Sequence, residues 1–189
     1  MNKAVADGNL DEMKKLKEEG YKLTNKCFQI ATTNGNIDAM KWLLANGCRF
    51  FKNDAFVFGA FEDAVKNGNL DNMKWLKANG CHFSYNTFGH AAKHGNIENM
   101  KWLFSNRCPF DDYTFNNAAK NGNLENMKWL QSNGCEYRHN TFDYAVWNLE
   151  NMKWLLENGC EFGKWTFYYA AQTGNLENIQ WLQDNGCPQ

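Results

Sequence analysis

The stretch from Thr114 to Cys135 decides the fold, and it reads T-F-N-N-A-A-K-N-G-N-L-E-N-M-K-W-L-Q-S-N-G-C. Nearly the same string runs from Thr87 to Cys108, T-F-G-H-A-A-K-H-G-N-I-E-N-M-K-W-L-F-S-N-R-C. The Asn in the middle of this string recurs 27, 33, 27, 27, 25 and 27 residues apart, at Asn9, Asn36, Asn69, Asn96, Asn123, Asn148 and Asn175. A 27-residue repeat, with one six-residue insertion and one two-residue deletion, therefore covers the whole chain.

Each repeat is predicted to form two short helices. In the fourth repeat the first helix runs roughly over residues 87–94, and the second begins after Asn96, whose side chain can accept a hydrogen bond from a free helical N–H. A Gly ends the second helix in most repeats, where a left-handed residue is expected. Arg107 replaces that Gly in the fourth repeat, so we expect the cap to be either strained or rearranged there, because residues with a Cβ resist positive φ.

Apolar residues cover two sides of the second helix. Ile97, Met100, Leu103 and Phe104 lie on one broad face, and Trp102 projects to another side. A helix of this kind is sandwiched between neighbours, which stacked repeats provide. The sequence therefore predicts an all-α solenoid of about seven stacked helix-turn-helix units, forming one domain over residues 1–189.

The string A-A-x-x-G-N-L-E-N-M-K-W-L-x-x-N-G-C resembles the ankyrin repeat, whose matching stretch is A-A-x-x-G-H-L-E-V-V-K-L-L-L-x-x-G-A. The unit is six residues shorter than the ankyrin repeat, so the resemblance implies an ankyrin-type solenoid with shortened β-turn fingers, and T-F replaces the T-P-L-H signature. It is similar to short ankyrin-like repeats with K-W-L…N-G-C found in long arrays in some giant viruses and protists. We therefore expect a module that binds a protein partner. The sequence contains no nucleophile-elbow, phosphate-binding glycine-loop or metalloprotease string, so neither catalysis nor a cofactor is predicted.

Composition narrows the possible partners. The chain has 20 basic and 21 acidic side chains, a net charge of -1, which disfavours a nucleic-acid binder and a polybasic membrane anchor. No apolar run approaches the roughly 18 residues needed to cross a bilayer, and the first residues show no signal peptide. We expect a monomeric, intracellular, cytoplasmic protein, in the host cytoplasm if it is viral.

Six of the seven cysteines recur at one equivalent position per repeat. Equivalent positions in stacked helices lie about 8–10 Å apart, whereas a disulfide needs Cα atoms within about 7 Å. We expect these cysteines to be small buried residues rather than disulfides or zinc ligands. Cys27 lies off this series and is expected to be a buried thiol.

A tryptophan recurs in the second helix of six repeats, where it can form either an aromatic platform for single-stranded nucleic acid or part of the core between repeats. We favour the core, because each neighbouring lysine has an acidic residue three positions earlier, as Lys101 has Glu98. His90 and His94 are spaced as two metal ligands can be, but no third ligand is evident, so no metal site is predicted.

Two irregular places are candidates for function. The insertion brings Phe51, Phe56 and Phe58 into an expected loop, where they either form an exposed apolar patch or pack against one another. The deletion places Trp147 at the lip of the groove, where it is either an anchor for a partner or a plug for the gap.

By the ankyrin resemblance, the two residues before the turn between the helices face the concave groove. We therefore predict that Lys66, Lys93, His94, Lys120 and Trp147 form a contiguous partner-binding surface. The alternative function is a structural array, a fragment of a longer solenoid with no partner of its own.

Overall fold

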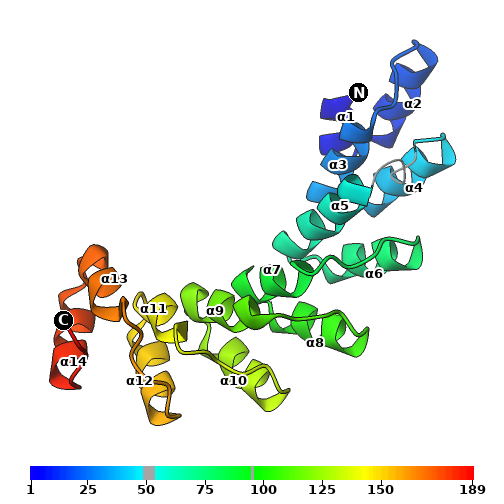
Figure 1. Cartoon of the computed structure of the whole chain (residues 1–189). Coiled ribbons are helices and arrows are strands. Elements are labelled where there is room, and N and C mark those ends of the chain that lie inside the picture. Colours follow the sequence, from blue (N-terminus) through cyan, green and yellow to red (C-terminus); the bar gives the residue numbers. More distant parts are fainter. Residues whose placement is uncertain (49–53, 95) are drawn as a thin grey trace. The chain divides into compact units, whose positions relative to one another are not determined.

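The computed structural model describes residues 1–48, 54–94 and 96–189, and these residues form fourteen α-helices and no β-strand (Figure 1). The helices pair along the chain into seven helix-turn-helix repeats. Their bounds are α1 Asn2–Ala6, α2 Leu10–Glu18, α3 Asn25–Thr33, α4 Ile37–Ala45, α5 Asp54–Lys66, α6 Leu70–Ala78, α7 Thr87–His94, α8 Ile97–Ser105, α9 Asp112–Asn121, α10 Leu124–Ser132, α11 Thr141–Ala145, α12 Leu149–Glu157, α13 Thr166–Thr173 and α14 Leu176–Asp184. The predicted all-α array of seven repeats is confirmed.

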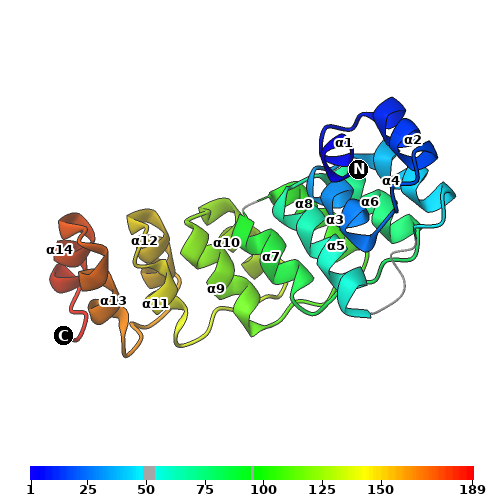
Figure 2. The same ribbon diagram turned by 90° about the horizontal axis from the view of Figure 1, so that it is seen from above.

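The chain divides into two compact units, residues 1–87 and 88–189. In the first unit α3 packs between α1 and α5, and α2 packs against α4. In the second unit α11 packs between α9 and α13, and α10 packs against α12. Figure 2 shows α9, α11 and α13 in one layer of this unit and α10, α12 and α14 in another. The first helices of successive repeats therefore share a layer within a unit.

The insertion does not form the loop expected around Phe56 and Phe58. Helix α5 begins at Asp54 and extends to Lys66, so both residues lie within a helix of 13 residues. The segment of α5 contains no proline that would interrupt a helix, and a helix pairs the backbone N–H and C=O groups of this segment with one another. Phe51 lies outside the described residues.

Asparagines close both ends of the second helices. The side chain of the N-cap Asn accepts a hydrogen bond from the backbone N–H three residues later in all seven repeats, as Asn96 does from Asn99 at 3.0 Å. At the other end, the Asn of the N-G-C motif donates to the carbonyl of the tryptophan four residues earlier, as Asn133 donates to Trp129 at 2.8 Å. Helix boundaries are thus set by residues within each repeat.

The glycine after the C-cap residue of the second helix, which is Glu19 in the first repeat and Asn elsewhere, has positive φ in every repeat but the fourth, as Gly134 does with a φ of 83°. Arg107 occupies that place in the fourth repeat with a φ of 56°, and it is the one non-glycine residue with positive φ among those described. Of the two outcomes expected at Arg107, the strained cap is therefore the one observed.

The tryptophans join successive repeats. Phe115 of the fifth repeat stacks on Trp154 of the sixth with ring centroids 6.3 Å apart, and Phe142 stacks on Trp181 in the same way at 6.5 Å. The phenylalanines are fully buried and the tryptophans are half-buried. The prediction that the tryptophans belong to the core between repeats is confirmed.

A buried asparagine recurs in the second helices of the last five repeats, and in three of them its side chain links two repeats. Asn72 donates to the carbonyl of Thr32 at 2.8 Å, and Asn151 donates to that of Ala119 at 3.1 Å. Among the described residues, the side-chain amides of Asn99 and Asn126 are buried with no hydrogen-bond partner. The matching place in the ankyrin string quoted above is Val, so this buried polar series departs from that pattern.

The threonine of the T-F motif connects its own turn to the preceding repeat. Thr141 Oγ1 accepts a hydrogen bond from the backbone N–H of Arg138 at 2.8 Å and donates to Asn116 Oδ1 at 2.7 Å. Thr166 repeats this arrangement with Gly163 and Asp143 at 2.9 and 2.6 Å. Helices α11 and α13 are therefore each tied to the preceding first helix by a side-chain hydrogen bond.

Candidate functional site

Helix α11 is short, and its length opens a hollow in the layer of first helices. It has 5 residues, whereas the flanking helices α9 and α13 have 10 and 8. The two-residue deletion causes this difference, because the chain passes from Val146 through Trp147 directly to Asn148, which still caps α12. Helix α11 is therefore shorter than its two neighbours by about one turn.

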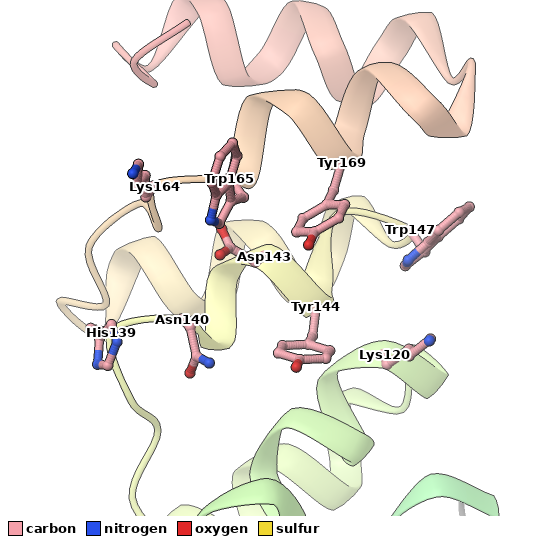
Figure 3. Close-up of a pocket in the computed structure, with 9 residues that line it drawn as sticks. All are labelled: Lys120, His139, Asn140, Asp143, Tyr144, Trp147, Lys164, Trp165 and Tyr169. Atoms are coloured by element: carbon pink, nitrogen blue, oxygen red, sulfur yellow. The ribbon is translucent and has the colours of Figure 1, made fainter.

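The hollow has a volume of about 670 Å³ and lies entirely within residues 88–189. It is lined by side chains from α9, α11 and α13 and from the connections between them (Figure 3). Four lining residues are aromatic: Tyr144, Trp147, Trp165 and Tyr169. Five are polar or charged: Lys120, His139, Asn140, Asp143 and Lys164.

The aromatic side chains are unusually accessible for their size. Trp147 is 54% exposed, Trp165 is 50% exposed and Tyr169 is 43% exposed. In Figure 3, Tyr144, Tyr169 and Trp147 extend from α11, α13 and the turn after α11 around the same opening, with Lys120 at the end of α9. Large aromatic side chains that are left half-exposed around a concavity are typical of protein-binding sites.

Asp143 forms part of the wall but is turned inward. Its side chain accepts the hydrogen bond from Thr166, and the residue is only 9% exposed. Burial raises the pKa of this carboxyl group, while the Thr166 hydroxyl, the Trp165 backbone N–H and the nearby His139 partly oppose the increase. A Cβ placed on Gly163 would lie 2.2 Å from Asp143 Oδ1, so the carboxylate fits only because residue 163 is glycine.

The lysines around the hollow differ from those on the second helices. Lys101 and Lys153 form ion pairs with the acidic residues three positions earlier, at 2.9 and 3.3 Å. Among the described residues, no acidic group pairs with Lys120 or Lys164, although Lys164 lies over the Trp165 ring with its Nζ 4.9 Å from the centroid. The polar rim of the hollow therefore carries positive charge that the chain itself leaves unneutralised.

The structure brings two of the predicted partner-binding residues, Lys120 and Trp147, into this hollow. Lys93 and His94 are exposed at the end of α7 but do not line it. Lys66 is exposed at the end of α5 in the first unit. A contiguous surface through all five residues stays a prediction, as does an apolar patch at the insertion.

Sequence reasoning did not find the other lining residues. The sequence does contain a signal for Tyr144 and Tyr169. Both occupy the position of His90 in the fourth repeat, and the residue type at this position varies between repeats. The residue types at the positions of Trp165 and Lys164 vary between repeats. Whether these two side chains line the hollow depends on the length of α11. Trp147 was found because it replaces the glycine of the turn between helices.

The cysteines add no chemistry to the site. All seven are buried and free, as predicted for the six that recur and for Cys27. Burial raises the pKa of the Cys81 thiol to about 12 and that of Cys160 to about 11, so both thiols stay neutral at physiological pH.

The described residues contain no group of three or more His, Cys, Asp or Glu side chains that could hold a metal ion. None of their helices is both long enough and apolar enough to cross a membrane.

Comparison with known proteins gives a structural match and no sequence match. No protein-family profile and no curated protein sequence matches the chain. Among solved structures, the ankyrin repeat domain of human ASB11 is similar with a TM-score of 0.64 and 21% sequence identity. The match covers 85% of this chain and 84% of that domain.

Proposed function

We propose, from the premise that this chain has the ankyrin-repeat fold, that it is a protein-interaction module whose partner binds in the hollow between α9, α11 and α13. Repeat solenoids of this kind generally act as binding surfaces, because each repeat contributes side chains to one extended face. The half-exposed Trp147, Trp165 and Tyr169 around one concavity are the observation that supports this location.

The energetics of interfaces favour this assignment. Tryptophan and tyrosine are enriched among the few residues that supply most binding energy, and such residues cluster in pockets that lose their water on binding. Four of the five K-W-L lysines on the second helices are already paired with acidic neighbours, and exposed pairs of this kind contribute little to binding or stability. The hollow is therefore the better place for a partner than the layer of second helices.

The experiment is an affinity capture from cell lysate, with bound proteins identified by mass spectrometry. The parent chain is compared with a Trp147→Ala/Tyr169→Ala variant and with Tyr113→Ala, which removes a 64% exposed aromatic residue that does not line the hollow. We expect a protein that is captured by the parent and by Tyr113→Ala and lost by the double variant. Circular dichroism and thermal unfolding show whether each variant is folded.

A partner retained by the folded double variant would remove the hollow from the proposal. A second arm carries Lys66→Glu and Lys93→Glu and tests the wider predicted surface, since both lysines are exposed and neither lines the hollow. Loss of the partner in this arm alone would place binding at the ends of α5 and α7. Capture of no protein by the parent would contradict the interaction function itself.

A further inference from the structure

The charges around the hollow restrict what can occupy it. Its ionisable lining residues are Lys120, His139 and Lys164 on the basic side and Asp143 on the acidic side. Asp143 is already engaged, since it is 9% exposed and accepts hydrogen bonds from the Thr166 hydroxyl and the Trp165 backbone. The charges that an occupant meets are therefore those of the two lysines.

These two lysines differ from most lysines at the K-W-L position of the second helices. Four of the five lysines at the K-W-L position form ion pairs with the acidic residue one turn earlier, as Lys41 does with Asp38 at 3.3 Å and Lys153 does with Glu150 at 3.3 Å. Lys120 and Lys164 form no ion pair with any described residue, although the chain has slightly more acidic than basic side chains. Positive charge without a neutralising neighbour favours an occupant that carries carboxylates.

The aromatic walls add a requirement for an apolar group. Trp147 and Tyr169 offer ring faces and edges that pack best against another aromatic or a large aliphatic side chain. Ring faces also attract cations, but here the lysines oppose a cationic occupant, and Lys164 already lies over the Trp165 ring. A site for a lysine or methylated lysine side chain is therefore disfavoured.

The size of the hollow suits a short segment. A volume of about 670 Å³ falls within the range of pockets that enclose small ligands, about 300–1,000 Å³, and holds a few side chains rather than a folded domain. Single-stranded nucleic acid also combines negative charge with flat rings, but such sites follow the strand with a continuous basic groove. Two lysines in a chain of net charge -1 do not supply that groove.

We propose that the hollow binds a peptide segment of the partner in which an aspartate or glutamate lies next to an aromatic or large aliphatic residue. The apolar side chain enters between Tyr144, Trp147 and Tyr169, and the carboxylate pairs with Lys120 or Lys164. This inference rests on the proposed function, because it specifies what part of the partner the hollow recognises.

The test is a selection of random 12-residue peptides displayed on phage, carried out on the full chain. The enriched sequences are synthesised with a fluorescent label, and their dissociation constants are measured by fluorescence polarisation at low and high salt. The variants are Lys120→Glu/Lys164→Glu, Trp147→Ala and the control Lys128→Glu, which reverses an exposed lysine on α10 in the other helix layer.

We expect enriched peptides that carry an acidic residue beside an apolar one. Their binding should weaken about tenfold or more in the lysine double variant and in Trp147→Ala, and less than about twofold in Lys128→Glu. It should also weaken as salt rises, because exposed ion pairs are screened.

The other outcomes overturn the inference in distinguishable ways. Enriched peptides that need Trp147 but contain no acidic residue would refute the charge requirement and leave the proposed function intact. Peptides that bind Trp147→Ala as tightly as the parent, or no enrichment at all, would refute peptide recognition by the hollow, while the lysate capture separately decides whether the chain binds a protein. A labelled oligothymidine that binds more tightly than any peptide and depends on Lys120 and Lys164 would replace the peptide with nucleic acid.

Discussion

The hydroxyl of Thr166 donates a 2.6 Å hydrogen bond to the buried carboxylate of Asp143. One repeat earlier, Thr141 makes the same contact with an uncharged residue, donating to Asn116 Oδ1 at 2.7 Å. An amide oxygen therefore meets the structural need of this position, and the negative charge of Asp143 is buried without being required for the contact. Burial of that charge raises the pKa of Asp143.

The first prediction follows from this comparison: Asp143→Asn stabilises the protein at neutral pH. A carboxyl group whose pKa is raised by folding holds its proton more tightly when folded, so the parent loses stability as the pH rises from the ordinary value of 3.8 through the raised pKa. The advantage of Asp143→Asn should be absent near pH 3.8 and below, and should grow to a plateau above the raised pKa. Urea unfolding from pH 4 to 7 measures it, and an advantage that is independent of pH would contradict this explanation.

The second prediction concerns Gly163, which leaves room for Asp143. Gly163→Ala should reduce the free energy of unfolding by about 1–3 kcal/mol, because its Cβ would lie 2.2 Å from Asp143 Oδ1. Adding Asp143→Ala should recover part of the loss by removing the crowded carboxylate. The control is Gly59→Ala, a helical position where an added Cβ meets no neighbouring atom within 4 Å among the described residues, and it should gain up to about 1 kcal/mol. Equal effects at Gly163 and Gly59 would refute the steric argument.

The third prediction concerns the strained turn at Arg107. Arg107→Gly should raise the free energy of unfolding by about 0.5–1 kcal/mol, because a φ of 56° is costly for a residue with a Cβ and free for glycine. The reverse change, Gly134→Arg in the next repeat, should lower it by a similar amount. Thermal or urea unfolding gives both values, and a loss of stability in Arg107→Gly would show that the arginine side chain contributes more than the strain removes.

The fourth prediction separates two buried asparagines at equivalent positions. Asn126 has no hydrogen-bond partner for its side chain among the described residues, so Asn126→Val should stabilise the protein by about 1–3 kcal/mol. Asn151→Val should gain less or lose stability, because Asn151 donates to the carbonyl of Ala119 at 3.1 Å. Identical shifts in the urea midpoint for the two variants would mean that this hydrogen bond has no net effect.

The fifth prediction concerns the buried thiols at alkaline pH. Unfolded thiols ionise near pH 9.0, but burial holds the pKa of Cys81 at about 12 and that of Cys160 at about 11. Stability that these thiols contribute at neutral pH should therefore be lost as the pH rises above about 9. The urea midpoint should fall less between pH 8 and 10.5 in a Cys81→Ala/Cys160→Ala variant than in the parent. Parallel curves for the two proteins would contradict this assignment.

The sequence predicts the features of the fold that arise within one repeat. Asn96 as an N-cap, the left-handed turn at Arg107 and the bounds of α7 all depend on residues within a few positions of each other, so they could be inferred without a structure. The helix that contains Phe56 was not predicted, because the six-residue insertion occurs in only one repeat and its pattern cannot be compared between repeats.

The candidate site was only partly predictable because it depends on contacts between repeats. Trp147 was visible as a break in the period, but its neighbours in the hollow come from two other repeats whose relation to it follows from the shortened α11. The accommodation of Asp143 by Gly163 depends on how closely α13 approaches α11, which periodicity does not report.

The hollow exists because residues are missing from one repeat, and this has a consequence for protein engineering. The second helix of each repeat is capped by residues of that same repeat, so the turn Val146-Trp147-Asn148 can be transferred to another repeat. Replacing the longer turn of another repeat with these three residues, together with two tyrosines at the matching first-helix positions, would create a second hollow at a chosen place. An array of this kind can acquire new recognition sites by shortening single turns, while the remaining repeats preserve its architecture.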